Sequence, residues 1–160
     1  MSISKPSQEQ FSKLIKYYQN RQFVDAEKLA ISITKEFPDH QFAWKVLGVL
    51  LIQVGRLSES LISTQKSVEL NPMDSEAHYN LGVILKSLDR SNEAEKSYRQ
   101  AIKLKPDYAE AHSNLGNTLQ ELGKLDEAEK SFRQAIELKP DFTEAHSNLG
   151  ITLQELGKFN

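Results

Sequence analysis

A carboxamide side chain recurs at one fixed spacing in the second half of the chain. Asn80, Asn114 and Asn148 stand 34 residues apart. An asparagine amide both donates and accepts hydrogen bonds, as recognition of a peptide backbone independently of its side chains requires. We therefore predict that these three asparagines contact a bound peptide. The alternative is that the amides bond to neighbouring groups within the protein's own helix layer.

Three histidines keep the same spacing, and Trp44 holds the equivalent position one period earlier: His78, His112 and His146. Imidazoles at a regular spacing suggest a metal or an acid–base site. Successive packed helix pairs, however, lie roughly 10 Å apart. Imidazoles at that separation cannot share one zinc ion through bonds of about 2 Å. We therefore predict a packing role for the histidines and no metal site.

Residues for other catalytic chemistry are lacking. The sequence contains no cysteine, which excludes disulfides, zinc–thiolate sites, iron–sulfur clusters and thiol catalysis. It also contains no glycine-rich phosphate loop and no pair of histidines with a glutamate on one helix face. We therefore predict that the protein is not an enzyme and needs no cofactor.

Net charge and hydropathy limit the classes of partner and the cellular compartment that we expect. Lys and Arg number 20 and Asp and Glu 22, which gives a net charge of -2. Such a balance offers no broad basic surface to nucleic acid or anionic lipid. The N-terminus lacks the pattern of a secretion signal, and the longest apolar run, 46–52, is too short to span a membrane. We expect a cytoplasmic protein that binds neither nucleic acid nor membranes.

The prolines show that the whole chain is periodic. Pro38, Pro72, Pro106 and Pro140 also stand 34 residues apart. A fixed period of this size is typical of repeat proteins. The period divides the chain into four full repeats and the start of a fifth: 7–40, 41–74, 75–108, 109–142 and 143–160. We expect one domain over 1–160.

Each repeat predicts two helices. In 109–142, apolar residues recur every three or four positions in two segments, which Gly123 separates and Pro140 ends. The first face holds Ala111, Leu115, Leu119 and Leu122, and the second holds Ala128, Phe132, Ala135, Ile136 and Leu138. The short turn at Gly123 makes the two helices antiparallel. The sequence therefore predicts an all-α protein built from helical hairpins.

One repeat carries a family resemblance. The run AEAHSNLGNTLQELGKLDEAEKSFRQAIELKPDF resembles a tetratricopeptide repeat, and its signature positions are Leu115, Gly116, Gly123, Ala128, Phe132, Ala135 and Pro140. The amino-acid sequences of the repeats are also similar to those of the repeats in O-linked N-acetylglucosamine transferases and in bacterial repeat arrays. The resemblance implies a right-handed superhelical solenoid. It also implies a concave groove, lined by the first helix of each repeat, that binds peptides or partner helices.

Under this resemblance the predicted groove has two parts. The C-terminal part is polar and contributes Tyr79, Asn80, Lys86, Asn114, Asn117 and Asn148. The N-terminal part is more apolar and contributes Phe11, Phe42, Lys45 and Val49. An exposed apolar groove would anchor an amphipathic partner helix or a second copy of the chain. The alternative is that these apolar residues belong to an ordinary core.

The predicted groove does not suit an acidic peptide tail. A free carboxylate needs charge-assisted donors, and Lys45 and Lys86 are the basic residues predicted on the inner face. The same face carries three glutamates at the repeat spacing, Glu76, Glu110 and Glu144. Their charges repel a carboxylate ligand.

The resemblance implies a protein-interaction scaffold whose partner is a protein or peptide. The alternative is an N-terminal module that presents substrates to a larger enzyme such as a transferase, because arrays of this family often precede catalytic domains. We also expect a concentration-dependent homodimer. Its interface would be either the apolar groove or the last predicted helix, 143–157, whose leucines no second helix covers: Leu149, Leu153 and Leu156.

Overall fold

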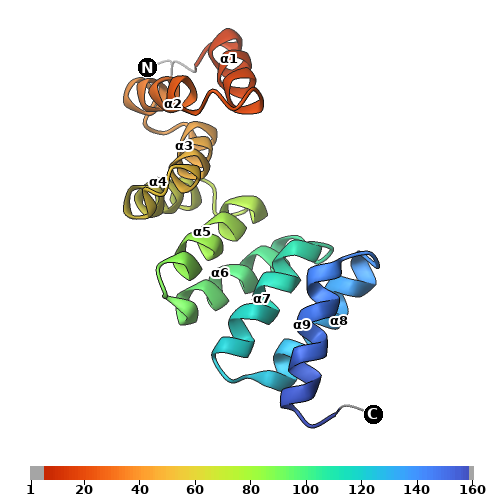
Figure 1. The fold of residues 1–160 in the computed structure, drawn as a ribbon. Helices are drawn as coiled ribbons and strands as arrows, with labels where there is room; N and C mark the ends of the chain where they lie inside the picture. The colour runs from red at the N-terminus through yellow and green to blue at the C-terminus, as the bar shows by residue number, and fades with distance from the viewer. Residues whose placement is uncertain (1–5, 159–160) are drawn as a thin grey trace. The chain divides into compact units, whose positions relative to one another are not determined.

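The computed structural model describes residues 6–158, and all regular structure in that range is helical (Figure 1). The helices are α1 (Gln8–Gln19), α2 (Phe23–Glu36), α3 (Gln41–Gln53), α4 (Leu57–Leu70), α5 (Ser75–Ser87), α6 (Ser91–Leu104), α7 (Ala109–Glu121), α8 (Leu125–Leu138) and α9 (Thr143–Glu155). We call the odd-numbered helices A helices and the even-numbered ones B helices. The predicted all-α class and the two helices per repeat are confirmed.

Proline and left-handed residues end the helices where the sequence indicates. Each B helix stops at a residue that precedes a proline, and that residue is extended, as at Lys139 (φ -140°, ψ 88°). A proline ring disfavours the helical conformation of the residue before it. Each A helix is followed by a residue with positive φ, either a glycine such as Gly123 (φ 71°) or, in two repeats, Arg21 (φ 58°) or Asp89 (φ 57°). The predicted turn at Gly123 is confirmed.

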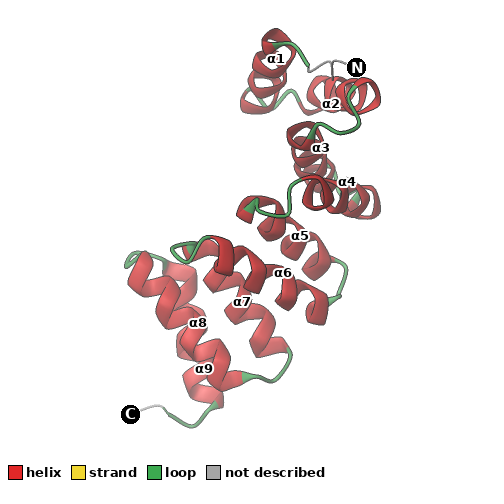
Figure 2. Cartoon of the chain, turned by 180° about the vertical axis from the view of Figure 1, so that it is seen from behind, coloured by secondary structure: helices red, strands yellow, loops and turns green. Residues whose placement is uncertain are grey.

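The chain divides into two compact units, residues 1–73 and 74–160, which we call the N-terminal and C-terminal units. In the N-terminal unit, α1 to α4 pack in sequence, each on the next, as Figure 2 shows from behind. Its core is built of small and branched apolar side chains and one aromatic ring: Leu14, Ala26, Ala30, Ile33, Phe37, Ala43, Leu47, Leu50 and Leu51. In the C-terminal unit, α5 to α9 pack in the same sequential way, with further contacts from α7 to both α5 and α9.

Hairpins in the C-terminal unit close through a glycine on the A helix and an aromatic ring on the B helix. A Cβ atom added to Gly82 would lie 2.6 Å from the ring of Tyr98, and one added to Gly116 would lie 2.6 Å from the ring of Phe132. Tyr98 is 1% exposed and Phe132 is 0% exposed. These rings therefore lie directly on the backbone of the facing helix, which no residue other than glycine permits at this distance.

The second repeat replaces this contact with polar atoms. Thr64 faces Gly48 in the position that Tyr98 and Phe132 hold in later repeats. Its buried hydroxyl oxygen has no hydrogen-bond partner among the described residues. Ser60, in the position of an alanine, donates to the carbonyl oxygen of Gly48 at 2.7 Å. The hairpin of α3 and α4 thus closes with small side chains and a buried hydrogen bond instead of an aromatic ring.

None of the helices between residues 6 and 158 has the length and apolar character that a membrane crossing needs.

Two glycine-to-alanine variants test the contact between the glycine and the aromatic ring. Gly116→Ala forces a methyl group into the buried ring of Phe132, and we expect a loss of about 1–2 kcal/mol of stability, because overpacking outweighs the better helix propensity of alanine. Gly150 holds the same repeat position in α9 but has no atom within 4 Å of its added Cβ. Gly150→Ala should therefore raise stability by up to about 1 kcal/mol.

The measurement is urea unfolding followed by circular dichroism. Equal effects of the two substitutions would show that the ring of Phe132 does not constrain the glycine beneath it.

Candidate functional site

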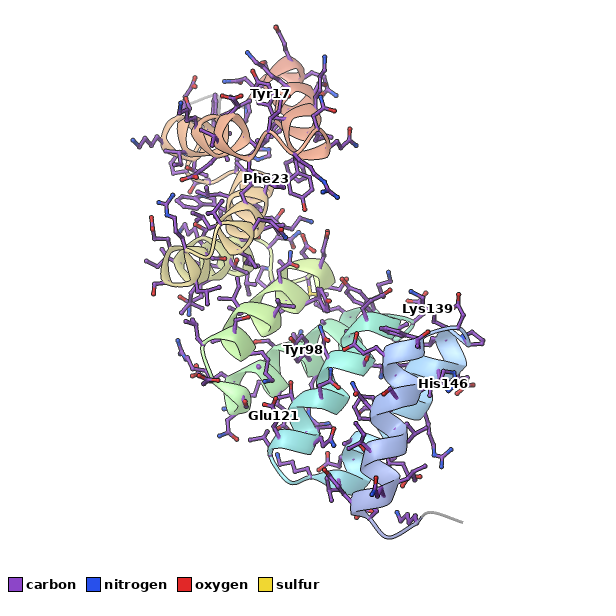
Figure 3. The ribbon with its side chains drawn as sticks, viewed as in Figure 1. Tyr17, Phe23, Tyr98, Glu121, Lys139 and His146 are labelled. Atoms are coloured by element: carbon purple, nitrogen blue, oxygen red, sulfur yellow. The ribbon has the colours of Figure 1, made fainter. Side chains whose placement is uncertain are left out.

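A cleft of about 340 Å³ opens among helices of the C-terminal unit. We call it the asparagine cleft; its lining residues are Lys86, Tyr98, Asn114, Asn117, Gln120, Glu121 and Asn148. Four of the predicted site residues are among them. Figure 3 labels two others, Tyr98 and Glu121. Tyr98 comes from the B helix α6 and was not predicted as a site residue, although its repeat position, shared with Phe132, marks it as an inward-facing ring.

Hydrogen bonds join the asparagine amides to one another and to a phenol. The Nδ2 of Asn114 donates to the hydroxyl of Tyr79 at 3.1 Å. The Nδ2 of Asn148 donates to Oδ1 of Asn117 at 2.7 Å. Asn117 in turn donates to the carboxylate of Glu144 at 3.2 Å. These half-buried amides are held in place from one A helix to the next, so their orientation is fixed before any ligand binds.

Tyr79 and Asn80 lie on α5 and do not line the cleft. Both are half-buried. The ring of Tyr79 packs against Tyr108 at a centroid distance of 4.9 Å and against Tyr98 at 6.0 Å. The three phenols thus form a cluster that meets the asparagine cleft at Tyr98, and Tyr79 connects this cluster to the amide of Asn114. The sequence indicated Tyr79 but not its two aromatic neighbours.

Burial raises the pKa of each phenol in this cluster. For Tyr79 the negative charges of Glu110 and Glu144 add to the effect of burial on its pKa. The pKa of Tyr98 is also raised, first by burial and then by Tyr79. Both shifts have the same physical reason, since a phenolate would be a charge in an apolar and already negative environment.

One ion pair joins two of the residues that line the cleft. The Nζ of Lys86 on α5 lies 2.5 Å from Oε1 of Glu121 on α7. The other oxygen of Glu121 accepts from the hydroxyl of Ser91 at 3.3 Å. Next to this pair, Gln120 donates to Glu155 on α9 at 3.3 Å. The predicted cation Lys86 is therefore neutralised by a neighbouring carboxylate.

The predicted apolar site residues lie in the N-terminal unit on α1 and α3. Phe11 packs edge to face on Phe42 with a centroid distance of 5.6 Å, and the ammonium of Lys45 lies 6.0 Å from the ring of Phe42. Phe11, Phe42, Lys45 and Val49 are all half-buried. On α1 the neighbouring Ile15 and Tyr18 are 41% and 38% exposed. The apolar side chains of this face are thus partly open to solvent.

A second cleft, of about 440 Å³, lies in the same unit beside Tyr18. The other lining residues are Gln19, Arg21, Phe23 and Gln53. The sequence did not indicate this cleft, because Phe23 begins a B helix and Arg21 belongs to the turn. The cleft lies at Arg21, a residue with positive φ in the turn between α1 and α2.

The periodic aromatic and imidazole side chains bind the loop that precedes each A helix. The indole Nε1 of Trp44 donates to the carbonyl oxygen of Pro38 at 2.7 Å. The Nε2 atoms of His112 and His146 bond the carbonyl oxygens of Pro106 and Pro140 at 3.0 and 2.8 Å. In each case the partner carbonyl lies six residues upstream. Among residues 6–158, no group of three or more His, Asp or Glu side chains is placed to hold a metal ion.

Charged side chains on the B helices form i,i+4 pairs and also pair with residues that follow the next A helix. Arg99 binds Glu95 at 3.0 Å, and Lys124 of the following turn binds the same carboxylate at 2.8 Å. Glu129 is held in the same way by Arg133 at 2.9 Å and Lys158 at 3.0 Å. The contacts to the next hairpin could not be predicted from helix spacing.

The raised pKa values predict a loss of stability at high pH. A phenol with a raised pKa in the folded state binds its proton more tightly there than in the unfolded chain, so folding stability is complete below about pH 10 and falls as the pH rises further. Tyr98→Phe, which copies the ring of Phe132, should reduce this fall. The prediction is tested by measuring the urea midpoint of unfolding for the native chain and for Tyr98→Phe from pH 8 to pH 12. An identical decline of the midpoint in both proteins would contradict the role of Tyr98.

Comparison with known families identifies the repeats. Sequence profiles described as tetratricopeptide repeat match residues 64–96 and 109–142, and one described as TPR repeat matches residues 84–123. No curated protein sequence matches the chain.

Solved structures of repeat proteins share the fold. The crystal structure of MamA protein has a TM-score of 0.86 and 25% identity, over 93% of this chain and 81% of MamA. YrrB, a TPR protein described as having an unusual peptide-binding site, has a TM-score of 0.83 and 19% identity, over 96% of this chain and 79% of YrrB. The first TPR of Spaghetti (RPAP3), bound to the HSP90 peptide SRMEEVD, has a TM-score of 0.72 and 26% identity, over 73% of this chain and 93% of that one.

Proposed function

Because the chain belongs to the tetratricopeptide repeat family, we propose that it is a protein-interaction scaffold that binds a peptide or a partner helix on its A helices. The asparagine cleft carries this proposal. The carboxamides of three asparagines line this one cleft: Asn114, Asn117 and Asn148. Such a set of donors and acceptors suits a peptide backbone.

Binding would exchange the internal bonds of the amides for bonds to the peptide. A backbone carbonyl can replace the hydroxyl of Tyr79 as the acceptor for Asn114, and it can replace Oδ1 of Asn117 as the acceptor for Asn148. Each exchange leaves the number of hydrogen bonds nearly constant, so the net gain for each is about 0.5–1.5 kcal/mol at most. Recognition by these hydrogen bonds alone is therefore weak.

Two of the similar structures support a peptide ligand. YrrB is described by its peptide-binding site, and the RPAP3 domain is bound to a peptide of HSP90. The alternative of a module within a larger enzyme gains no support from these matches, since the matched sequence profiles describe the repeat alone.

The proposal extends to the N-terminal unit, where the face of Phe11, Phe42, Lys45 and Val49 would receive an apolar or amphipathic segment. Ile15 and Tyr18 provide the exposed apolar area beside it. Asn80 and Tyr79 would contribute to the C-terminal site from α5, and Lys86 through its ion pair with Glu121. We further propose a cytoplasmic scaffold without catalytic activity that does not bind nucleic acid or membranes.

The repeat boundaries are part of the proposal. Residues 7–40, 41–74, 75–108 and 109–142 each contain one A and one B helix, and 143–160 contains α9. We propose that these repeats act as one domain over 1–160, of which residues 1–5 and 159–160 lie outside the described part.

Removal of the amides tests the peptide site. A peptide is first selected on the purified protein from a random 12-residue phage library. The triple variant Asn80→Ala, Asn114→Ala, Asn148→Ala should then bind the synthetic peptide at least about tenfold more weakly, because three hydrogen bonds are lost. The melting temperature should fall only modestly, because Asn114 and Asn148 each lose one hydrogen bond to a neighbouring A helix, worth about 0.5–1.5 kcal/mol. Asn92→Ala, at an exposed position of α6, is the control, and an unchanged affinity of the triple variant would remove the asparagines from the site.

Self-association is a separate proposal with two candidate surfaces. On α9, Ile151 is 46% exposed, whereas Leu149, Leu153 and Leu156, predicted to be uncovered, are half-buried by packing within the unit. On α1, Ile15 is the corresponding exposed residue. Dimers should appear in sedimentation velocity at tens of micromolar. Loss with Ile151→Glu places the interface on α9, loss with Ile15→Glu places it on the apolar face, and a monomer at all concentrations refutes the dimer.

A further inference from the structure

Three carboxylates border the asparagine cleft. Glu121 lines it directly. Glu144 accepts a hydrogen bond from the lining residue Asn117, and Glu155 accepts one from the lining residue Gln120. Glu144 and Glu155 stand 11 positions apart on α9, which is three helical turns, so both point to the same face of that helix. The cleft therefore has an acidic rim on its α7 and α9 sides.

The cations near this rim do not balance it. Lys86 is the one basic residue that lines the cleft, and it is already paired with Glu121. Glu144 and Glu155 form no ion pair with any residue in the described range 6–158, and both are exposed. Each carboxylate accepts one amide hydrogen and has room for further donors, since a carboxylate offers about four acceptor positions.

From this arrangement we propose that the asparagine cleft selects a peptide segment that carries lysine or arginine side chains and excludes acidic segments. The inference rests on the proposed function, because it specifies the chemistry of the peptide that the same cleft binds. The amides would hold the peptide backbone, and Glu144 and Glu155 would pair with its basic side chains. The charge of the rim then determines which sequences bind.

Negative charge also acts on the tyrosine cluster beside the cleft. After burial, the charges of Glu110 and Glu144 are what raise the pKa of Tyr79. Glu110 has one cation near it, Lys139, at 3.6 Å. An acidic side chain brought to this end of the cleft would meet the same repulsion, and a basic one would be attracted.

The proposed preference for basic peptides contrasts with the acidic peptide that is bound to one structural neighbour. The first TPR of RPAP3 is bound to the peptide SRMEEVD, which has three acidic residues near its end. On this chain Glu144 and Glu155 border the cleft without a cation partner in the described range, and Lys86, the lysine that lines it, is already paired with Glu121. We expect SRMEEVD to bind this protein no better than a scrambled peptide.

The test compares peptides selected from the random 12-residue phage library on three forms of the protein. The first is the native chain, and the second carries Glu144→Gln and Glu155→Gln, each of which keeps one acceptor oxygen and removes one charge. The third is a matched control, Asp107→Asn with Glu137→Gln, which removes two charges at exposed positions that do not line the cleft. Peptides from the native chain and the control should be enriched in Lys and Arg and depleted in Asp and Glu, and those from the cleft variant should not.

Affinity measurements then give the size of the effect. In a selected synthetic peptide, replacement of its basic residues by Glu should weaken binding to the native chain by about tenfold, since each exposed ion pair contributes about two- to fivefold. The difference should shrink at 1 M salt, where the Debye length falls to about 3 Å. The cleft variant should lose most of the discrimination, and the control should keep it.

The outcomes separate this inference from the proposed function. Peptides that are selected without any charge preference, or that keep their preference on the cleft variant, overturn the acidic rim as the selector and leave peptide binding intact. Failure to select any peptide above background on the native chain overturns peptide binding and the inference with it.

Discussion

The close approach of an aromatic ring to a glycine backbone is the contact on which the C-terminal unit depends. Tyr98 lies on Gly82 and Phe132 lies on Gly116, each at a distance that leaves no space for a Cβ atom. The pair sets how near the two helices of a hairpin come, because a larger residue in the place of the glycine would push the ring away. The rest of each repeat adjusts to this distance, including the small alanines Ala94 and Ala128 that are fully buried.

That contact also builds the asparagine cleft. Tyr98 is the ring over Gly82 and at the same time one of the residues that line the cleft. The asparagines that line the same cleft bond across from one A helix to the next. Packing and recognition therefore meet at Tyr98, and a change in helix spacing would disturb both.

The two units use different chemistry on comparable faces. The C-terminal unit presents half-buried amides with acidic neighbours, whereas the N-terminal unit presents the edge-to-face pair of Phe11 and Phe42 beside exposed aliphatic side chains. Amides suit an extended backbone and an apolar face suits the stripe of an amphipathic helix. A scaffold with both surfaces can hold different kinds of segment on its two units.

The sequence by itself determined the helices, their ends and the repeat, because these depend on local causes: the period of 34, proline after each B helix, and left-handed residues such as Gly123 after each A helix. It also identified four of the residues that line the cleft. Only the tertiary structure decided how Asn114, Asn117 and Asn148 bond, that Lys86 is neutralised by Glu121, and that His112 binds a loop carbonyl. These contacts join side chains through distances set by packing between helices, and periodicity within one helix carries no information about them.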